Sequence, residues 1–389
     1  MNILISTIAD LKKTAHGRPH QFIKYLLSMG HDITIISINA WWLKDMYSNL
    51  YYDNYFEEMF QKANIIYLTK QRANPIIQEI FSFKTLFKSV DYDLFDLHIN
   101  YHSFVTGYLI GKKMFGLNVP TVCDIADDLP AYMSATPQIP RLLRPFAGFV
   151  TERIMRKNIQ IADKVTFTLN SLRETYNIPK SKSELIPNGV DTQLFRSYPS
   201  EQLREELGID QSFVIGYVGV LREWVDFEPI FSAIKDLDAP LKLLIVGEEG
   251  GFEENKNLVK RYGISDKVLF AGTVPYTQVP RYISCMDICL IPFKTNAVSE
   301  NALPLKLFEY MACEKAVIST KLRGVVDVAL NKVLYASTKE EFKDKIIKLY
   351  KDEDLRRKMG LEGRKFVEED YSWSKIASKF ERVLLEVVS

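Results

Sequence analysis

Short runs of β-branched and other apolar residues alternate with helical stretches along this chain, and the alternation starts twice. One series begins at residues 2–7 and another at residues 213–219, FVIGYVG. Such runs are typical of strands buried on both faces of a parallel sheet, with helices as the crossover connections. The pattern therefore predicts an α/β protein with two doubly wound, Rossmann-like domains. The other predicted strands are 32–38, 64–68, 94–99, 120–124, 165–169, 241–249, 267–272, 288–293 and 316–320.

A cluster of turn residues marks the boundary between the two series. The tripeptide PNG at 187–189 favours a turn, and the second set of strands follows it. A chain of 389 residues is also long enough for two domains. We therefore expect domains at 1–190 and 191–371, followed by an amphipathic helix at 372–389.

Charge and composition exclude several classes of protein. Lys plus Arg number 50 and Asp plus Glu number 49, so the net charge of +1 creates no field that would attract nucleic acid. The sequence contains neither a P-loop nor a G-x-G-x-x-G fingerprint, and its five histidines show no metal-ligand spacing. We expect no metal, no cofactor, and cysteines that are small buried apolar residues.

The N-terminus lacks the basic and long apolar regions of a signal peptide, and no window approaches a membrane-spanning helix. A cytoplasmic protein is therefore expected. The stretch 141–157 sets basic residues among apolar ones, which suits a helix touching anionic lipid on the inner face of a membrane and equally suits a solvated helix face. Its basic residues are Arg141, Arg144, Arg153, Arg156 and Lys157.

The stretch NALPLKLFEYMACEKAVIST carries the strongest signal for a binding site. Pro304 suits the first position of a helix, because the N–H that it lacks would be unpaired there. The amides of Leu305, Lys306 and Leu307 would then point out of the helix N-terminus and bind an anion, and Lys306 adds a positive charge. The alternative is an amphipathic helix with an incidental lysine.

Glu309 lies further along the same helix, roughly 7 Å from its mouth at 1.5 Å per residue. A phosphate at the mouth and a carboxylate at this distance match the reach from a diphosphate to a ribose diol. A carboxylate can accept hydrogen bonds from both hydroxyls of such a diol. The open α/β sheets expected here bind ligands at the carboxyl ends of their strands, so we expect a cleft between the two domains.

Several segments resemble one enzyme family in order and spacing. IPNGVDTQLF, LLIVGEE, VLFAGTVPYTQVPRYISCMDICLIPF and PLKLFEYMACEKAVIST, within 183–320, look like the GT-B glycosyltransferases of the retaining group 4 kind, also called glycosyl transferases group 1. MNILIST and YSWSKIASKF resemble the two ends of such proteins, so the resemblance covers nearly the whole chain. GVLREWVDF is similar to a subgroup associated with cell-surface polysaccharide synthesis.

The resemblance implies transfer of a hexosyl or related sugar from a nucleotide-diphosphate donor to a glycan or lipid-linked acceptor, without a bound metal. Residues 1–190 would form the acceptor domain, with helix 372–389 packing back on it, and 191–371 the donor domain. Two other functions stay open. One is a nucleotide-sugar epimerase of the same fold, and the other is a non-catalytic partner subunit that binds nucleotide sugars.

The family pattern maps onto donor-side residues one by one. Its second glutamate, which grips the ribose, matches Glu309. Its first glutamate, which meets the donor sugar, falls on Asn301, and both this residue and its neighbour Glu300 are candidates for that contact. The glycine-ended strand at Gly219 precedes Arg222, the candidate phosphate clamp, which lies two residues from the commonest position. Arg222, Lys306 and Glu309 would be the catalytic residues.

On the acceptor side the resemblance is looser. Gly17 would let the backbone approach a phosphate or acceptor, and Arg18 and His20 are candidate acceptor contacts. Where the family often has His-Asp before a proline, this chain has Ala126 and Asp127. Asp127 is a candidate acceptor or sugar contact and equally a loop-capping aspartate.

Thr273 and Val274 follow the strand VLFAG, where the resemblance implies backbone contacts to the nucleotide base. Contacts of that kind leave little trace in side chains, so the sequence does not name the base. It does not name the sugar or the acceptor either.

Overall fold

The computed structural model describes residues 1–41, 43, 54–69, 72–73, 77–79, 86, 90–102, 104–136, 139–248 and 250–389. They form two compact units, Met1–Pro187 with Ser374–Ser389, and Asn188–Trp373. Against the predicted ranges 1–190 and 191–371, the chain passes between the units after Pro187, inside the predicted turn cluster, and again after Trp373.

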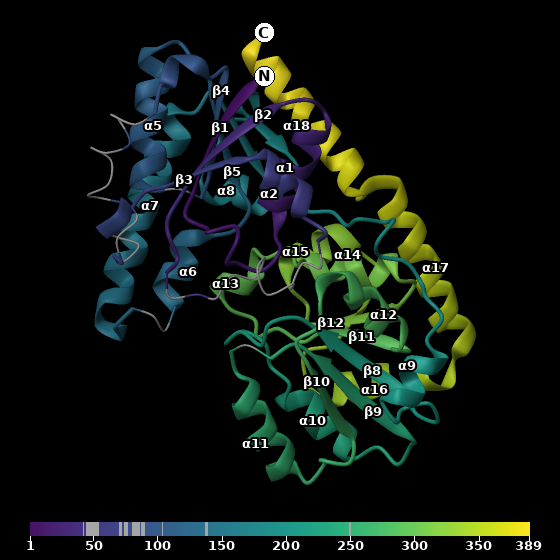
Figure 1. The fold of residues 1–389 in the computed structure, drawn as a ribbon. Coiled ribbons are helices and arrows are strands. Elements are labelled where there is room, and N and C mark those ends of the chain that lie inside the picture. Colours follow the sequence, from purple (N-terminus) through teal and green to yellow (C-terminus); the bar gives the residue numbers. More distant parts are fainter. Residues whose placement is uncertain are drawn as a thin grey trace. The chain divides into compact units, whose positions relative to one another are not determined.

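Unit 1 contains a parallel sheet whose described strands follow the order β3-β2-β1-β4-β5-β6-β7. Because the order reverses at β1, the crossover helices lie on both faces. Figure 1 shows α5 and α7 on one face and α1 on the other. The strands are β1 (Asn2–Thr7), β2 (Asp32–Ser37), β3 (Asn64–Tyr67), β4 (Leu97–Tyr101), β5 (Thr121–Ile125), β6 (Lys164–Phe167) and β7 (Ser183–Leu185). The helices are α1 (Arg18–Ser28), α2 (Glu57–Lys62), α5 (Val105–Gly116), α6 (Leu129–Ala135), α7 (Arg144–Ile161) and α8 (Asn170–Thr175), with 3-10 turns η1 (Tyr92–Leu94), η2 (Arg141–Leu143) and η3 (Lys180–Lys182).

The last helix, α18 (Trp373–Val388), belongs almost entirely to unit 1 (Figure 1). The ring of Phe380 stacks on that of Phe22 in α1, with 4.2 Å between the ring centroids. Glu381 lies 2.8 Å from His31 Nε2, and Lys379 donates to the carbonyl of Leu185 at 2.8 Å. The amphipathic pattern read from the sequence thus buries its apolar face on the N-terminal domain.

Unit 2 repeats the doubly wound plan with the strand order β10-β9-β8-β11-β12-β13 among its described residues. All pairs in this sheet are parallel. The strands are β8 (Phe213–Val218), β9 (Leu241–Val246), β10 (Val268–Gly272), β11 (Ile288–Ile291), β12 (Ala316–Ser319) and β13 (Leu334–Tyr335). The helices are α9 (Glu201–Glu206), α10 (Glu228–Lys235), α11 (Phe252–Tyr262), α12 (Val279–Ser284), α13 (Ala297–Glu300), α14 (Leu305–Ala312), α15 (Arg323–Ala329), α16 (Lys339–Lys351) and α17 (Glu353–Asp370), with the 3-10 turn η4 (Tyr276–Gln278).

The structure confirms two parallel sheets and corrects details of the strands. The strand predicted from residue 94 starts only at Leu97, because Leu94 ends the turn η1, where Asp91 accepts from the amide of Asp93. The edge strands β7 and β13 were not predicted. They span three and two residues, which is too short for a periodic pattern to appear. None of the described helices combines the length and the apolar character that crossing a bilayer requires.

Candidate functional site

The predicted anion-binding helix exists, and its first turn differs from the prediction. Helix α14 begins at Leu305, and Pro304 precedes it as the N-cap residue with an extended ψ of 133°. The prediction that Pro304 is the first helical residue is therefore wrong. Its carbonyl instead accepts from the amide of Leu307 at 3.1 Å, so that amide is engaged by the chain itself. Of the three predicted amides, those of Leu305 and Lys306 have no recorded acceptor among the described residues.

The side chain of Lys306 lies over the carboxyl end of β8. Its Nζ is 5.0 Å from the ring centroid of Tyr217 and 5.1 Å from that of Phe293. A Cβ added at Gly219 would stand 3.2 Å from the same nitrogen. The ammonium thus rests where the end of a strand meets the start of α14, the place where a doubly wound sheet binds phosphates.

Lys306 and Glu309 lie three residues apart on α14, and both side chains are half-buried. Burial lowers the pKa of Lys306, and the charge of Glu309 works in the opposite direction. Burial likewise raises the pKa of Glu309, against the effect of Lys306. In the free protein, therefore, the charged forms of both groups lack the solvation that they would have in water. A polar ligand with an anionic group and hydroxyls would supply it.

Three glycines end three neighbouring strands at this edge of the sheet. Gly219, Gly247 and Gly272 follow or close β8, β9 and β10 with φ of +134°, +128° and +73°, a region in which side chains are strained. The amide of Gly247 donates to the carbonyl of Gly272 at 2.8 Å, and a Cβ on Gly247 would collide with the carbonyl of Gly219. The backbones of these strand ends therefore pack closely against each other, and Gly219 among them lies beside Lys306.

Sequence reasoning singled out only Gly219 among these glycines. The signal for the others was present, because the runs GYVG, LLIVG and VLFAG each end in glycine. A glycine at the carboxyl end of a buried parallel strand indicates that the backbone there must be approached closely.

Arg222 occupies the loop after β8 and is exposed. Its positive charge acts on the phenol of Tyr217, although burial is the larger influence and raises the pKa of that phenol. Lys306, from α14, lies over the same ring. The loop is fixed at its base, where Val225 pairs with Phe293 and the amide of Lys294 donates to Trp224 O at 2.7 Å.

The two candidates for the sugar contact have different surroundings. Glu300 accepts from the amide of Arg323, the first residue of α15, at 3.2 Å. Its carboxylate therefore stabilises a helix N-terminus. Asn301 is the C-cap of α13, whose own N-terminus is held by a capping box between Asn296 and Ser299. The structure thus gives Glu300 a structural partner at the N-terminus of α15, and which of the two residues contacts the sugar stays a prediction.

Thr273 and Val274 lie in the loop after β10 and line a cavity of about 830 Å³. The walls also include Tyr198, Leu203 and Tyr282, from the region of α9 and α12. Neither Lys306 nor Glu309 lines this cavity, so the structure does not gather all predicted donor contacts around one hollow. The cavity and the start of α14 lie along the same sheet edge, where the amide of Gly247 donates to the carbonyl of Gly272.

The predicted role of Gly17 finds no support in its backbone. It is the N-cap of α1 with an extended φ of −158° and ψ of −178°, and an added Cβ would make only an ordinary 3.6 Å contact with Pro19. Its neighbour Arg18 is buried and donates two hydrogen bonds to Asp124, at 2.7 and 2.9 Å, and a third to the carbonyl of Pro187 at 2.8 Å. Arg18 therefore ties α1 to β5, and its assignment as an acceptor contact is wrong.

His20, another acceptor candidate, is buried with Nε2 2.8 Å from the carbonyl of Leu11. Burial lowers its pKa to about 4, so the ring is neutral near neutral pH. The structure thus favours a packing role.

Asp127 follows β5 at the carboxyl edge of the sheet in unit 1, beside a histidine that the sequence did not single out. His102, which follows β4, has a φ of +56°, and its Nε2 accepts from the amide of Ala126 at 3.0 Å. That bond leaves the proton of the neutral ring on Nδ1. Burial raises the pKa of Asp127, and the positive charge that His102 carries when protonated is the strongest of the opposing influences. An imidazole therefore does reach the position next to Asp127, from a different strand.

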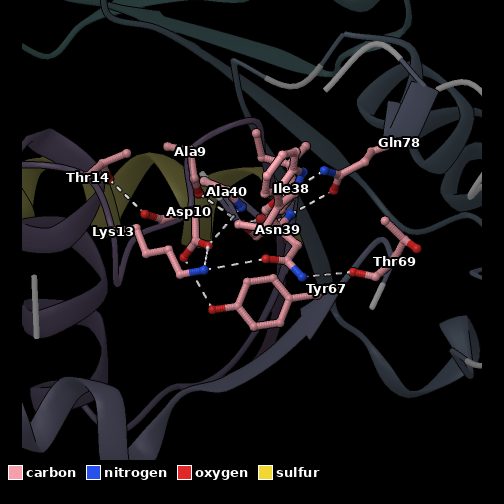
Figure 2. Close-up of polar contacts among 12 residues, drawn as sticks. Ala9, Asp10, Lys13, Thr14, Ile38, Asn39, Ala40, Tyr67, Thr69 and Gln78 are labelled. Carbon is pink, nitrogen blue, oxygen red and sulfur yellow. Dashed lines mark hydrogen bonds and ion pairs between the residues drawn. The ribbon is translucent and has the colours of Figure 1, made fainter. Parts of the chain in front are cut away.

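A third feature of unit 1 is the buried carboxylate of Asp10 in the loop after β1 (Figure 2). It accepts from the amide of Ala40 at 3.1 Å and from the hydroxyl of Tyr67 at 3.2 Å, and Lys13 Nζ is 3.8 Å away. Its carbonyl accepts from the amides of Lys13 and Thr14. Residues 9–14 are thereby fastened to the ends of β2 and β3. Burial raises the pKa of Asp10.

Possible metal ligands and the cysteines were also located in the described part of the chain. Among these residues no group of three or more His, Cys, Asp and Glu side chains is placed to hold a metal ion. The cysteines Cys123, Cys285, Cys289 and Cys313 are all free and buried, which confirms the prediction that they are buried apolar residues.

Comparison with known proteins extends this geometry. The model of Glycosyltransferase Family 4 matches residues 19–194, and that of Glycosyl transferases group 1 matches residues 199–366. The N-acetyl-alpha-D-glucosaminyl L-malate synthase of Bacillus anthracis is 26% identical over 307 residues, which are 75% of this chain and 74% of that protein.

A second relative is the GDP-mannose-dependent alpha-(1-6)-phosphatidylinositol monomannoside mannosyltransferase of Mycobacterium tuberculosis, 24% identical over 59% of this chain and 63% of that protein. Among solved structures, Anabaena HepE in complex with UDP and glucose superposes with a TM-score of 0.75, covering 99% of this chain and 100% of that chain at 15% identity. This likeness shows the fold, and it confirms the predicted GT-B class.

Proposed function

Since this chain belongs to the GT-B glycosyltransferases of group 1, we propose that it moves a sugar from a nucleotide-diphosphate donor to a glycan or lipid-linked acceptor and retains the configuration at the transferred carbon. The observation that carries the proposal is the start of α14. There the amides of Leu305 and Lys306, the ammonium of Lys306 and the carboxylate of Glu309 accompany a glycine-ended strand edge. A nucleotide diphosphate carries both groups that this arrangement would bind, an anion for the amides and the ammonium and a ribose diol for the carboxylate.

The donor would bind with its diphosphate at the mouth of α14. Lys306 and Arg222 would stabilise the negative charge that builds on the departing diphosphate, a contribution of preorganised positive groups that needs no proton transfer. Glu309 would accept both ribose hydroxyls, and Asn301 would bond to the hydroxyls of the sugar. Two cations and a helix N-terminus supply the charge that a metal ion provides in other phosphate sites, so we propose metal-independent transfer of a hexosyl or related sugar.

The acceptor would bind to unit 1, at the edge where Asp127 and His102 lie together. The neutral imidazole and the carboxylate provide a donor and an acceptor of hydrogen bonds for a sugar hydroxyl. The loop 9–14, anchored by Asp10, lies at the same carboxyl edge of the sheet. The variant His102→Asn should keep the fold, because asparagine tolerates a positive φ. Since it removes the imidazole, we expect slower transfer and unchanged donor binding.

The biological role proposed here is the synthesis of a cell-surface polysaccharide by a cytoplasmic enzyme at the inner face of a membrane. Two observations support it. The segment GVLREWVDF resembles that subgroup, and one relative is named for a phosphatidylinositol-linked acceptor.

A thermal-shift panel of UDP-, GDP- and dTDP-sugars tests the donor, beginning with UDP-glucose because HepE binds UDP and glucose. A donor at 100 times its dissociation constant stabilises the folded state by about 2.7 kcal/mol. The stabilising donor is then incubated with glycan and lipid-linked acceptor pools. Conversion of the donor alone into an epimeric nucleotide sugar would identify an epimerase instead. Binding with no turnover on any acceptor would identify a non-catalytic subunit, the alternative that Asn301 motivates.

A further inference from the structure

Four large apolar side chains are exposed together at one end of unit 1. They come from η2 and the first turns of α7: Leu142 is 93% exposed, Leu143 55%, Phe146 67% and Phe149 56%. An exposure of 93% means that the side chain protrudes from the surface with almost nothing beside it. Apolar groups that gather in this way on a folded protein mark an interaction surface.

The opposite side of α7 prevents the helix from turning these residues inward. Gly148 lies so close to α6 that a Cβ there would collide with the hydroxyl of Ser134. Further along, Asn158 accepts from Asn100 at 2.9 Å and donates to the carbonyl of Phe104 at 3.1 Å. Figure 1 shows α7 beside α5 and α6. The apolar residues are thus held outward by the fold.

Basic residues continue the same exposed stripe toward the end of the helix. Arg153 and Lys157 follow Phe149 at helical spacing and are exposed, and the guanidinium of Arg153 is 5.5 Å from the ring centroid of Phe149. Arg156 is paired with Glu152 at 2.8 Å. That glutamate is the only acidic residue in the stretch 141–157, which contains five basic residues. The surface is therefore apolar at its N-terminal end, from Leu142 to Phe149, and positively charged toward its C-terminal end, at Arg153 and Lys157.

We propose that this surface, residues 141–157, docks onto an anionic phospholipid bilayer. Leu142, Leu143, Phe146 and Phe149 would enter the boundary between headgroups and acyl chains, while Arg153 and Lys157 contact lipid phosphates. The pattern of an apolar tip with a basic flank is that of an interfacial helix. The protruding shape favours a soft lipid phase, because a protein partner would need a matching groove for each side chain. From Phe146 to Lys157 the stripe is roughly 17 Å long, enough to span several headgroups.

Membrane docking deepens the proposed function and rests on it only for its purpose, access to a lipid-linked acceptor. The docking surface belongs to unit 1, and the proposed donor site belongs to unit 2.

Co-sedimentation of the full-length protein with vesicles tests the proposal without any sugar transfer. Vesicles of phosphatidylcholine alone are compared with vesicles that also contain phosphatidylglycerol. We expect binding to the mixed vesicles, weakened by salt. Leu142→Ser with Phe146→Ser should reduce it at least about tenfold. Arg153→Glu with Lys157→Glu should reduce it about 25-fold or more, because each basic residue near an anionic surface contributes about a fivefold gain. All four side chains are exposed, so the variants should fold.

Matched controls lie in unit 2. Leu361→Ser removes an apolar side chain that is 51% exposed, and Lys260→Glu reverses an exposed charge. Both should bind vesicles like the parent protein. Equal binding to both vesicle types, or binding unaffected by the changes at Leu142 and Phe146, would overturn the proposal. So would a concentration-dependent dimer, seen by sedimentation, that these same changes abolish.

The donor thermal shift is measured on the same variants. A variant that loses vesicle binding and keeps the donor thermal shift has lost only the docking surface. A protein that binds vesicles and shows no shift with any nucleotide sugar would leave the docking surface intact and remove the proposed function.

Discussion

Lys306 Nζ lies directly against the strand end at Gly219, where an added methyl group would be only 3.2 Å from it. Because Gly219 has no side chain, the ammonium of Lys306 can lie this close to the strand end. Because the two belong to different elements, β8 and α14, their contact joins the edge of the sheet to the proposed phosphate site.

Gly219→Ala should weaken donor binding. The new methyl group makes the ammonium shift by a few tenths of an ångström. The φ of +134° also strains any residue other than glycine, at a cost of about 1–3 kcal/mol in the free energy of unfolding. Donor affinity is measured by calorimetry, and stability by denaturant unfolding. Gly208→Ala is the control, since Gly208 also has a positive φ and nothing within 4 Å of an added Cβ. A donor affinity unchanged by Gly219→Ala would contradict the role of this contact.

Glu309→Gln should reduce donor affinity by about 1.5–3 kcal/mol, the range for hydrogen bonds to a charged group. The free protein should not lose stability, because burial disfavours the carboxylate, as the raised pKa of Glu309 indicates. Titration with the nucleoside diphosphate alone measures the ribose contact without the sugar. Glu314→Gln, an exposed residue just beyond α14, serves as the control. Equal affinity in parent and variant would remove Glu309 from the ribose site.

Donor binding should take up protons at Lys306. Burial holds its pKa below the ordinary value of 10.5, and a bound diphosphate raises it again by favouring the ammonium. Affinity should therefore fall as the pH rises from the lowered pKa toward 10.5. In the same window the unfolded chain binds this proton more tightly than the folded protein does, so the stability of the free protein should rise with pH.

Calorimetry in two buffers of different ionisation enthalpy measures the proton uptake. Lys306→Arg should lose the pH dependence and keep a measurable affinity, because a guanidinium stays charged throughout this range. Uptake that persists in Lys306→Arg would assign the proton to another group.

Asp10→Asn should loosen the loop 9–14. Asparagine offers one acceptor oxygen where Asp10 uses both, one toward Ala40 and one toward Tyr67, and it also loses the attraction to Lys13. The expected loss of stability is about 1–3 kcal/mol, with faster hydrogen exchange at the amides of Lys13 and Thr14. Asp210→Asn changes an exposed carboxylate in unit 2 and should affect neither measurement. Unaltered exchange in the loop would show that it is held by its backbone alone.

Local patterns predicted the features that local physics decides. The β-branched runs became buried parallel strands, and the PLKLFEY stretch became a short helix with Lys306 and Glu309 on it. A run of residues carries its own period and its own termination signals, so these elements depend little on distant parts of the chain.

Features that depend on distant partners were missed or misread. Arg18 looked like a free cation near a glycine, yet its partner Asp124 is 106 residues away. Glu300 was a candidate for the sugar contact, but its carboxylate accepts from the amide of Arg323, the first residue of α15. His102 reaches Ala126 only because β4 and β5 are neighbours in the sheet. Even the first turn of α14 depended on whether Pro304 took a helical or an extended ψ, which its ring does not fix.

The return of the chain to unit 1 after Trp373 has a consequence for synthesis on the ribosome. The surface of α1 around Phe22 is covered by α18, whose residues leave the ribosome only after all of unit 2. Until α18 has been made, the aromatic face of α1 around Phe22 lacks the helix that covers it. During translation, the half that is made first is the half that is finished last.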